Sequence, residues 1–326
     1  MFASKNVLVT GGTGMIGRAL VQMLLERGAT VRVVSRDEAD RCPPGAEFMQ
    51  LDLTDPEACR TAVRGMDIVF HLVGVKGSPA MTKSRPASFF VPVLLFNTNM
   101  MEAARRADVE WYLYTSTVGV YHPAEILKED DVWRTLPSPN DWFSGWAKRM
   151  GELQAEAYKI EYGWDRTSIV RPANVYGPYD NFDLDTGMVI PSLIRRAVDG
   201  ENPLRVWGDG TSVRDFIHCD DVARGMIYTM EQRITEPLNL GMGVGRSVRD
   251  LVGIISKHLA KPPEVVWDTT KPSGDRMRIL DMTRAKQHGF EPQITLEQGV
   301  PEVMEWYRTH RDEVAQRYSV FSQNKG

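Results

Sequence analysis

The chain has 326 residues, 42% of them hydrophobic and 25% charged, and 39 Lys and Arg against 43 Asp and Glu give a net charge of −4. This length predicts about two domains, and the composition excludes collagen-like, coiled-coil and largely disordered chains. Because nucleic-acid binding needs a clustered basic surface, the charge balance argues against a nucleic-acid partner. It still allows a local basic pocket for a phosphorylated ligand.

The N-terminus and the cysteines indicate the compartment. Met1–Lys5 lacks the apolar core of a signal peptide, and no window of about 18 apolar residues predicts a membrane span. Cys42, Cys59 and Cys219 are scattered and odd in number, which argues against a disulfide framework. We therefore expect a cytoplasmic protein with no membrane partner. The histidines are dispersed as well, so we expect no metal site.

Short runs of β-branched residues alternate with helical patterns through the first half of the chain. The first expected strand, Val7–Thr10, precedes a helical pattern that closes at Gly28. Further strands are expected at Val31–Val34, Phe48–Leu51, Ile68–Leu72, Tyr112–Thr115 and Arg166–Val170, and a helix at Gly145–Tyr162. Continuous apolar strands separated by helices indicate a parallel sheet covered on both faces. The sequence thus predicts an α/β fold with a doubly wound sheet.

The regular alternation ends after Arg171, where Pro172, Gly177 and Pro191 interrupt the pattern. We expect a sheet domain at residues 1–171 and a smaller mixed α/β domain at 172–326, from which segments could return to the sheet. The second domain should bind substrate at the carboxyl edge of the sheet, where doubly wound folds hold their ligands. Near the end, Gln298–His310 has the pattern of an amphipathic helix.

A glycine-rich loop joins the first strand to the first helix. Gly11 permits a tight turn, Gly14 lets the backbone approach a pyrophosphate, and Gly17 allows close helix–strand packing. Free backbone N–H groups and the positive end of the helix dipole would face the phosphates. This context predicts a Rossmann-type dinucleotide site. The cofactor contacts expected in the loop are Gly11, Thr13, Gly14, Met15, Ile16 and Gly17.

The Gly-x-x-Gly-x-x-Gly order resembles the extended short-chain dehydrogenase/reductase family, the NAD-dependent epimerases and dehydratases that modify nucleotide sugars. The end of the second strand carries Ser35 and Arg36 where an acidic residue would bind an NAD ribose, which favours NADP, although Asp37 follows closely. NADP or NAD is therefore the expected cofactor. The resemblance implies cofactor contacts from Ser35, Arg36, Asp52, Leu53, Leu72, Val73, Lys148, Pro172 and Asn174.

The family transfers hydride between the nicotinamide and a sugar carbon, usually C4. This chemistry needs a base for the sugar hydroxyl, a hydroxyl that orients it and a cation that lowers the pKa of the base. The resemblance assigns the orienting hydroxyl to Thr117 and the cation to Lys148. Ser144 stands four residues before Lys148, where the family carries the tyrosine base.

Ser144 cannot simply take over the role of that tyrosine. A phenol has a pKa of about 10, which a nearby ammonium lowers, whereas an aliphatic alcohol is a far weaker acid on a shorter side chain. The chain is therefore a Tyr-to-Ser variant of an active enzyme, an enzyme that uses another base or a water, or a catalytically silent binding protein. Tyr121 and Tyr179 are candidate substitutes, although packing explains each of them better.

The second half resembles the GDP-L-fucose synthase-like branch of the family, in segments such as Asn174–Phe182 and Val206–Thr211. The chemistry agrees, because arginines suit a nucleotide diphosphate and Trp207 could stack on a base. The resemblance implies substrate contacts from Lys76, Asn174, Val189, Arg196, Trp207, Arg214 and Arg278. A homodimer is typical of the family.

Two reaction types lose support because their residues are missing. The fucose synthases epimerise two centres with a cysteine and a histidine at positions that are Gly119 and Met188 here. The family's dehydratases use an Asp-Glu pair where this chain has Val118 and Gly119. Of the family's reaction types, redox chemistry at C4 of a GDP-linked hexose is the one that the sequence still supports. A retained oxidised cofactor would give 4-epimerisation, and exchanging NADPH would give 4-keto-sugar reduction.

Overall fold

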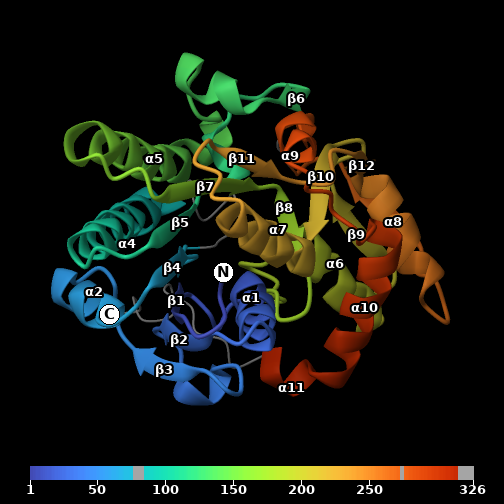
Figure 1. The fold of residues 1–326 in the computed structure, drawn as a ribbon. Coiled ribbons are helices and arrows are strands. Elements are labelled where there is room, and N and C mark those ends of the chain that lie inside the picture. The colour runs from blue at the N-terminus through green and yellow to red at the C-terminus, as the bar shows by residue number, and fades with distance from the viewer. Residues whose placement is uncertain (76–83, 272–274, 315–326) are drawn as a thin grey trace.

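A seven-stranded sheet lies at the centre of the computed structural model, which describes residues 1–75, 84–271 and 275–314 (Figure 1). Its strand order is β11-β7-β5-β4-β1-β2-β3, and all neighbouring strands are parallel. The strands are β1 (Asn6–Thr10), β2 (Thr30–Ser35), β3 (Glu47–Gln50), β4 (Ile68–His71), β5 (Trp111–Thr115), β7 (Thr167–Pro172) and β11 (Leu238–Leu240). The predicted α/β sheet is thereby confirmed.

Helices cover both faces of this sheet, because successive strand residues point to opposite sides. Val7 and Val9 pack in the buried cluster that contains α1 (Met15–Glu26) and α7 (Cys219–Glu231). Leu8 packs on the other side, under α2 (Pro56–Val63), α4 (Pro86–Arg106) and α5 (Trp142–Tyr162). Figure 1 shows α4 and α5 side by side along their face of the sheet. The sheet is therefore doubly wound, as predicted.

The second half of the chain contributes to the same sheet. The helix α7 packs against α1, and β11 pairs in parallel with β7 at the sheet's edge. Segments after residue 171 thus do return to the sheet. The division into domains at 1–171 and 172–326 stays a prediction.

A second, mixed sheet lies beside the carboxyl ends of the first. Its order is β12-β10-β14-β6, with β8 paired to β10, and a separate pair joins β13 to β9. These strands are β6 (Ile126–Leu127), β8 (Asn174–Tyr176), β9 (Leu204–Trp207), β10 (Val213–His218), β12 (Gly245–Ser247), β13 (Val265–Asp268) and β14 (Met277–Leu280). The helices around them are α6 (Val189–Val198), α8 (Val248–Lys257), α9 (Thr283–Gln287), α10 (Leu296–Thr309) and α11 (Arg311–Val314).

The segment between β5 and α5 connects the two sheets. It contains β6 and the short 3-10 turns η2 (Val118–Val120), η3 (Glu129–Arg134) and η4 (Pro139–Asp141), and β6 pairs with β14. Another 3-10 turn, η1 (Ala39–Arg41), follows β2. The η4 turn, directly before α5, contacts β14 through the ion pair of Asp141 with Arg278, so a site can form between the two sheets there. In the described ranges, no helix has the length and apolar character needed to cross a membrane.

Two helices begin earlier than the sequence pattern predicts, for local reasons. The last long helix, α10, starts at Leu296 because Thr295 and Gln298 form a reciprocal capping box. The helix α5 starts at Trp142, after the η4 turn that Ser138 caps, and not at Gly145. It ends on Gly163, whose φ of 64° gives the left-handed cap that glycine adopts readily.

Candidate functional site

The glycine-rich loop has the shape of a phosphate cradle. Gly11 has a φ of 72°, and a Cβ on it would lie 3.3 Å from the backbone N of Val73. A Cβ on Gly17 would lie 2.3 Å from the carbonyl O of Gly11, so only glycine allows this approach. Gly14 caps α1 without any side-chain hydrogen bond, which leaves the first N–H groups at Met15 and beyond to a ligand. The loop fits a dinucleotide pyrophosphate.

A small polar cluster lies behind this loop, at the end of β2. Asp37 Oδ2 accepts hydrogen bonds from Thr13 Oγ1 at 2.6 Å and from Ser35 Oγ at 3.2 Å. Arg36 pairs instead with Asp52, at 3.1 Å between Nη1 and Oδ2, and both side chains are partly exposed. The structure thus places Arg36 and Asp52 together, as a cation and an anion beside the expected ribose end of the cradle.

The remaining residues predicted to line the cofactor lie at or after the ends of β3, β4 and β7 and at the starts of α1 and β8. Leu72 N donates to the Thr10 carbonyl O at 3.2 Å at the end of β4, beside Val73. Leu53 is buried after β3. Ile16 packs against the core from the first turn of α1, Pro172 ends β7 beside β11, and Asn174 begins β8.

His71 ends β4 just before Leu72 and Val73, and its hydrogen bonds could not be predicted from the sequence. Its ring lies between Thr10 Oγ1 (2.9 Å from Nδ1) and Asn97 Oδ1 (3.0 Å from Nε2), and it is fully buried. Burial, together with the charge of Lys148, lowers the pKa of His71 to about 3. The neutral ring therefore joins β4 to α4. The sequence signal for such a buried polar contact is a polar residue, His71, at the end of an otherwise apolar strand.

Lys148 is buried on α5 and points to the carboxyl end of β5. Its Nζ donates to the Thr115 carbonyl O at 2.8 Å. Burial lowers the pKa of Lys148 to about 7, and the negative charge of Glu152 opposes part of that effect. The Lys148 side chain can thus lose a proton as an ammonium, or gain one as an amine, near neutral pH. Thr115 Oγ1 is a buried hydroxyl without a hydrogen-bond partner among the described residues.

Thr117 and Ser144 come from segments that pack closely together. Thr117 caps η2, where its Oγ1 accepts from Gly119 N at 3.3 Å. A Cβ on Gly145 would lie 2.5 Å from the Gly119 carbonyl O, so α5 approaches η2 at van der Waals distance. Ser144 Oγ donates to the Asp141 carbonyl O at 3.1 Å, within the first turn of α5. Its hydroxyl is engaged with the helix backbone.

Neither candidate substitute tyrosine lies free in a pocket. Tyr121 is buried, donates to Asn239 Oδ1 at 2.5 Å and accepts from Arg171, and burial raises its pKa. Tyr179 packs its ring against Trp306, with ring centroids 4.8 Å apart. Both tyrosines thus have packing or hydrogen-bond partners, and their predicted structural role stays a prediction.

A buried ion pair lies directly behind the strand end that carries Thr117. Arg171 donates from Nε and Nη2 to the two carboxylate oxygens of Glu152, at 3.0 and 2.6 Å, and both side chains are almost fully buried. Ser116 Oγ also donates to Glu152, at 2.6 Å. Glu152 thus ties α5, β5 and β7 together one helical turn after Lys148. Sequence reasoning did not identify this pair.

The expected substrate residues are distributed over the second sheet, the separate β9 strand and helix α6. Asn174 donates to the Asp215 carbonyl O at 2.9 Å, and Val189 is the first residue of α6. Trp207 is 57% exposed at the end of β9. Arg196 pairs with Glu201 at 2.5 Å and so has a local partner on its own surface. Lys76 lies outside the described residues.

Arg214 and Arg278 are direct neighbours on β10 and β14. Arg278 pairs with Asp141 at 2.7 Å and also with Asp275, and its side chain is 13% exposed. Burial lowers the pKa of Arg214, and the charge of Arg278 adds to that effect. Two arginines and two carboxylates thus form a half-buried group between the second sheet and the start of α5, beside Ser144.

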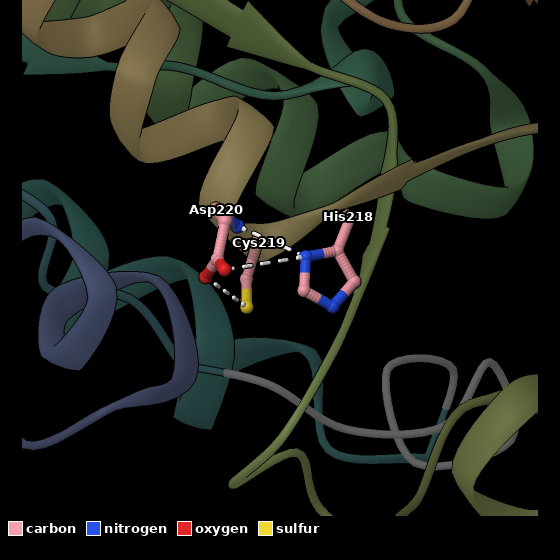
Figure 2. Close-up of side chains that lie close together, drawn as sticks. All are labelled: His218, Cys219 and Asp220. Carbon is pink, nitrogen blue, oxygen red and sulfur yellow. Dashed lines mark hydrogen bonds and ion pairs between the residues drawn. The ribbon is translucent and has the colours of Figure 1, made fainter. Parts of the chain in front are cut away.

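Figure 2 shows a separate cluster at the junction of β10 and α7, formed by His218, Cys219 and Asp220, whose potential ligand atoms lie within 4.8 Å of one another. His218 Nδ1 accepts from Asp220 N at 3.3 Å and so caps α7. The Cys219 thiol points to the Asp220 carboxylate, with Sγ and Oδ1 3.5 Å apart, and burial raises the pKa of that thiol. Helix capping accounts for the arrangement of this cluster.

Comparisons with known proteins agree with this geometry. The chain is 30% identical over 329 residues to the GDP-L-fucose synthase of Escherichia coli, covering 95% of this chain and 98% of that protein. It is 29% identical over 323 residues to a dTDP-4-dehydro-6-deoxy-D-allose reductase of Streptomyces, covering 95% and 98%. Among solved structures, UDP-glucose 4-epimerase of Thermotoga maritima with UDP-glucose superposes with a TM-score of 0.83 at 29% identity, covering 94% and 99%.

The family model that matches residues 7–241 spans β1 to β11, and so contains the glycine cradle, Thr117, Lys148 and the whole parallel sheet. The chain belongs to the NAD dependent epimerase/dehydratase family.

Proposed function

We propose that this protein is an NAD(P)-dependent nucleotide-sugar epimerase or reductase that acts at C4 of a GDP-linked hexose. One observation supports the proposal: the glycine cradle after β1 and the buried Lys148 with Thr117 after β5 lie at the carboxyl edge of the same parallel sheet. A bound nicotinamide would accept or donate hydride there. Lys148, at the carboxyl end of β5, would bind and orient the ligands, and Thr117 would orient the sugar hydroxyl.

The relatives support the substrate class. GDP-L-fucose synthase and dTDP-4-dehydro-6-deoxy-D-allose reductase are both named for nucleotide-linked sugars, and the UDP-glucose 4-epimerase structure contains UDP-glucose. The neighbouring arginines Arg214 and Arg278 would bind the diphosphate. The carboxylates of Asp141 and Asp275, which pair with Arg278, would then lie close to the diphosphate. The decisive measurement is incubation with a panel of GDP- and UDP-sugars, followed by detection of a C4 epimer or 4-keto product.

Among cofactors, NADP fits better than NAD. Arg36 is partly exposed, and a 2′-phosphate could share its guanidinium with Asp52 or displace that carboxylate. Replacing Arg36 by Ala should weaken NADPH binding at least tenfold and leave NADH binding nearly unchanged, as measured by fluorescence titration. Equal losses for both cofactors would argue against a role in 2′-phosphate recognition.

We also propose a cytoplasmic homodimer that pairs through α4 and α5. Val91 and Leu95 of α4, with Leu153 and Ile160 of α5, are large apolar side chains that are 43–78% exposed. Covering such a face with a second copy would remove apolar surface from water. Light scattering during size-exclusion chromatography should give twice the monomer mass, and a double Leu95→Glu and Ile160→Glu variant should give the monomer.

A catalytically silent nucleotide-sugar-binding protein is the second candidate, favoured by Ser144 and by the bond of its hydroxyl to the Asp141 carbonyl. Binding of a GDP-sugar without product formation would support it. Ser144→Tyr separates the two functions further. A gain in hydride transfer would identify the phenol as the missing group, whereas no gain would refute the view that only this tyrosine is absent. The cofactor released on denaturation adds a criterion, since retained NAD or NADP favours the epimerase.

A further inference from the structure

The proposed redox reaction needs a group that takes a proton from the sugar hydroxyl, and Ser144 does not supply one. Its Oγ donates to the Asp141 carbonyl O at 3.1 Å, so the hydroxyl stabilises the first turn of α5. An acceptor must lie within hydrogen-bond reach of the substrate. The side chains around the start of α5 are therefore the place to look for it.

The Asp141 carboxyl group lies beside Thr117, above Gly119. A Cβ built on Gly119 would lie 3.1 Å from the Cβ of Asp141 and 3.3 Å from its Cγ. The same point is 3.4 Å from Cγ2 of Thr117. The Asp141 carboxyl group and the methyl group of Thr117 thus flank one spot, while the Thr117 hydroxyl accepts from Gly119 N at 3.3 Å. Glycine at 119 leaves that spot open, and any larger residue would force Asp141 to move.

Arg278 holds this carboxylate in place. Its Nη1 lies 2.7 Å from Asp141 Oδ2, and the Asp141 side chain is 31% exposed, whereas that of Arg278 is 13% exposed. A carboxylate can accept about four hydrogen bonds. The ion pair with Arg278 uses only part of that number, so the Asp141 carboxylate can still accept a hydrogen bond from a ligand. The Asp141 carboxyl group is thus oriented by Arg278 and accessible from outside.

We propose that Asp141 is a catalytic residue that accepts the proton of the sugar C4 hydroxyl in place of the absent phenol, and this inference rests on the proposed function. During oxidation the O–H bond breaks and its proton passes to the Asp141 carboxylate. The C4–H bond breaks with its electron pair, which leaves as hydride for the oxidised nicotinamide, and the C4–O bond becomes a carbonyl. During reduction the same proton returns from Asp141 to the oxygen.

Asp275 provides a matched control, because it is a second carboxylate on Arg278. It also accepts from Asn140 Nδ2 at 2.6 Å, and its side chain is only 9% exposed. Asp275→Asn and Asp141→Asn each remove one charge from the same guanidinium. A purely structural role for Asp141 predicts similar losses in both variants. Proton transfer predicts a loss of turnover in the Asp141 variant that the Asp275 variant does not share.

The experiment compares both variants with the wild type in hydride transfer, followed by NAD(P)H absorbance with the most active nucleotide sugar. Asp141→Asn should lower kcat about 100-fold or more, in the range of general acid–base catalysis. Asp275→Asn, beside the proposed diphosphate site, should change KM but lower kcat less than tenfold. Thermal unfolding checks that each variant folds. If Asp141→Asn does not fold, Asp141→Glu keeps the charge, and displacing its carboxyl by a methylene should still lower kcat at least tenfold.

Calorimetry supplies a readout that needs no turnover. A group that accepts from the C4 hydroxyl strengthens binding of the 4-hydroxy sugar nucleotide but not of its 4-deoxy analogue. Asp141→Asn should weaken the former about tenfold and leave the latter unchanged. Equal weakening of both, a kcat within threefold of wild type, or an equal loss in Asp275→Asn would overturn the assignment. A wild type that transfers no hydride with any sugar nucleotide would overturn the proposed function as well.

Discussion

Replacing Glu152 by Gln tests whether the buried ion pair stabilises the fold behind the site. The substitution keeps the shape of the side chain and removes its charge. Arg171 then loses the charged partner of its Nε and Nη2 groups, and keeps the Tyr121 hydroxyl and the Glu129 carbonyl at Nη1. Breaking a buried pair leaves an uncompensated charge, which costs about 3–5 kcal/mol. The loss of charge at the Ser116 hydrogen bond adds to that cost.

Urea denaturation at pH 7 measures this effect as the loss of unfolding free energy. Glu156→Gln, one turn further along α5 on the exposed surface, is the control and should change stability by less than about 0.5 kcal/mol. A Glu152→Gln and Arg171→Met double variant removes both charges, and we expect it to regain part of the stability. If Glu152→Gln costs less than about 1 kcal/mol, the carboxylate is not the main partner of the guanidinium, and the reasoning is refuted.

Three further predictions concern the cradle and the buried titratable groups. Gly17→Ala should weaken NADPH binding more than tenfold in a fluorescence titration, because its Cβ would meet backbone at 2.3 Å, whereas Gly253→Ala, with open space around it, should bind normally. Because the pKa of Lys148 is lowered to about 7, the unfolded chain binds more protons than the folded protein between about pH 7 and 10.4. The free energy of unfolding of the wild type should therefore rise with pH in that range. Lys148→Met should lose this rise when denaturation is measured at several pH values. The pKa of His71 is lowered to about 3, so stability should fall as pH drops from about 6.5 to 3, and His71→Gln should flatten that limb of the same curve.

Much of the fold could be predicted because its signals are local. A β run, the glycine-rich loop and an amphipathic helix lie within 21 residues, and the structure forms the strand, turn and helix there. Apolar strands of four to six residues likewise gave the parallel sheet, since burial on both faces requires continuous apolar runs. The short strand β11, with only three residues, has no comparable periodicity in the sequence.

The chemistry of the site depends on contacts that the sequence does not encode locally. Arg278 and Asp141 are 137 residues apart, and only the packing of β14 against the start of α5 brings them together. Arg171 and Glu152 lie on a strand and a helix whose spacing is set by the sheet. Arg196 differs, because its partner Glu201 follows five residues later and could have been recognised as a local ion pair. Long-range pairing thus decides which arginines are available to a phosphate.

The roles of positions 144 and 141 are coupled, which gives a final prediction. A tyrosine at 144 would offer a phenol next to the Lys148 ammonium, and that base would make the Asp141 carboxylate redundant. If Asp141 transfers the proton in the natural chain, Asp141→Asn should be severe alone and mild when Ser144→Tyr is also present. Hydride-transfer rates of the four proteins measure this coupling as a double-mutant cycle. Independent, multiplicative effects would mean that Asp141 and a residue at 144 do not serve the same step, and the carboxylate would then act only through its pair with Arg278.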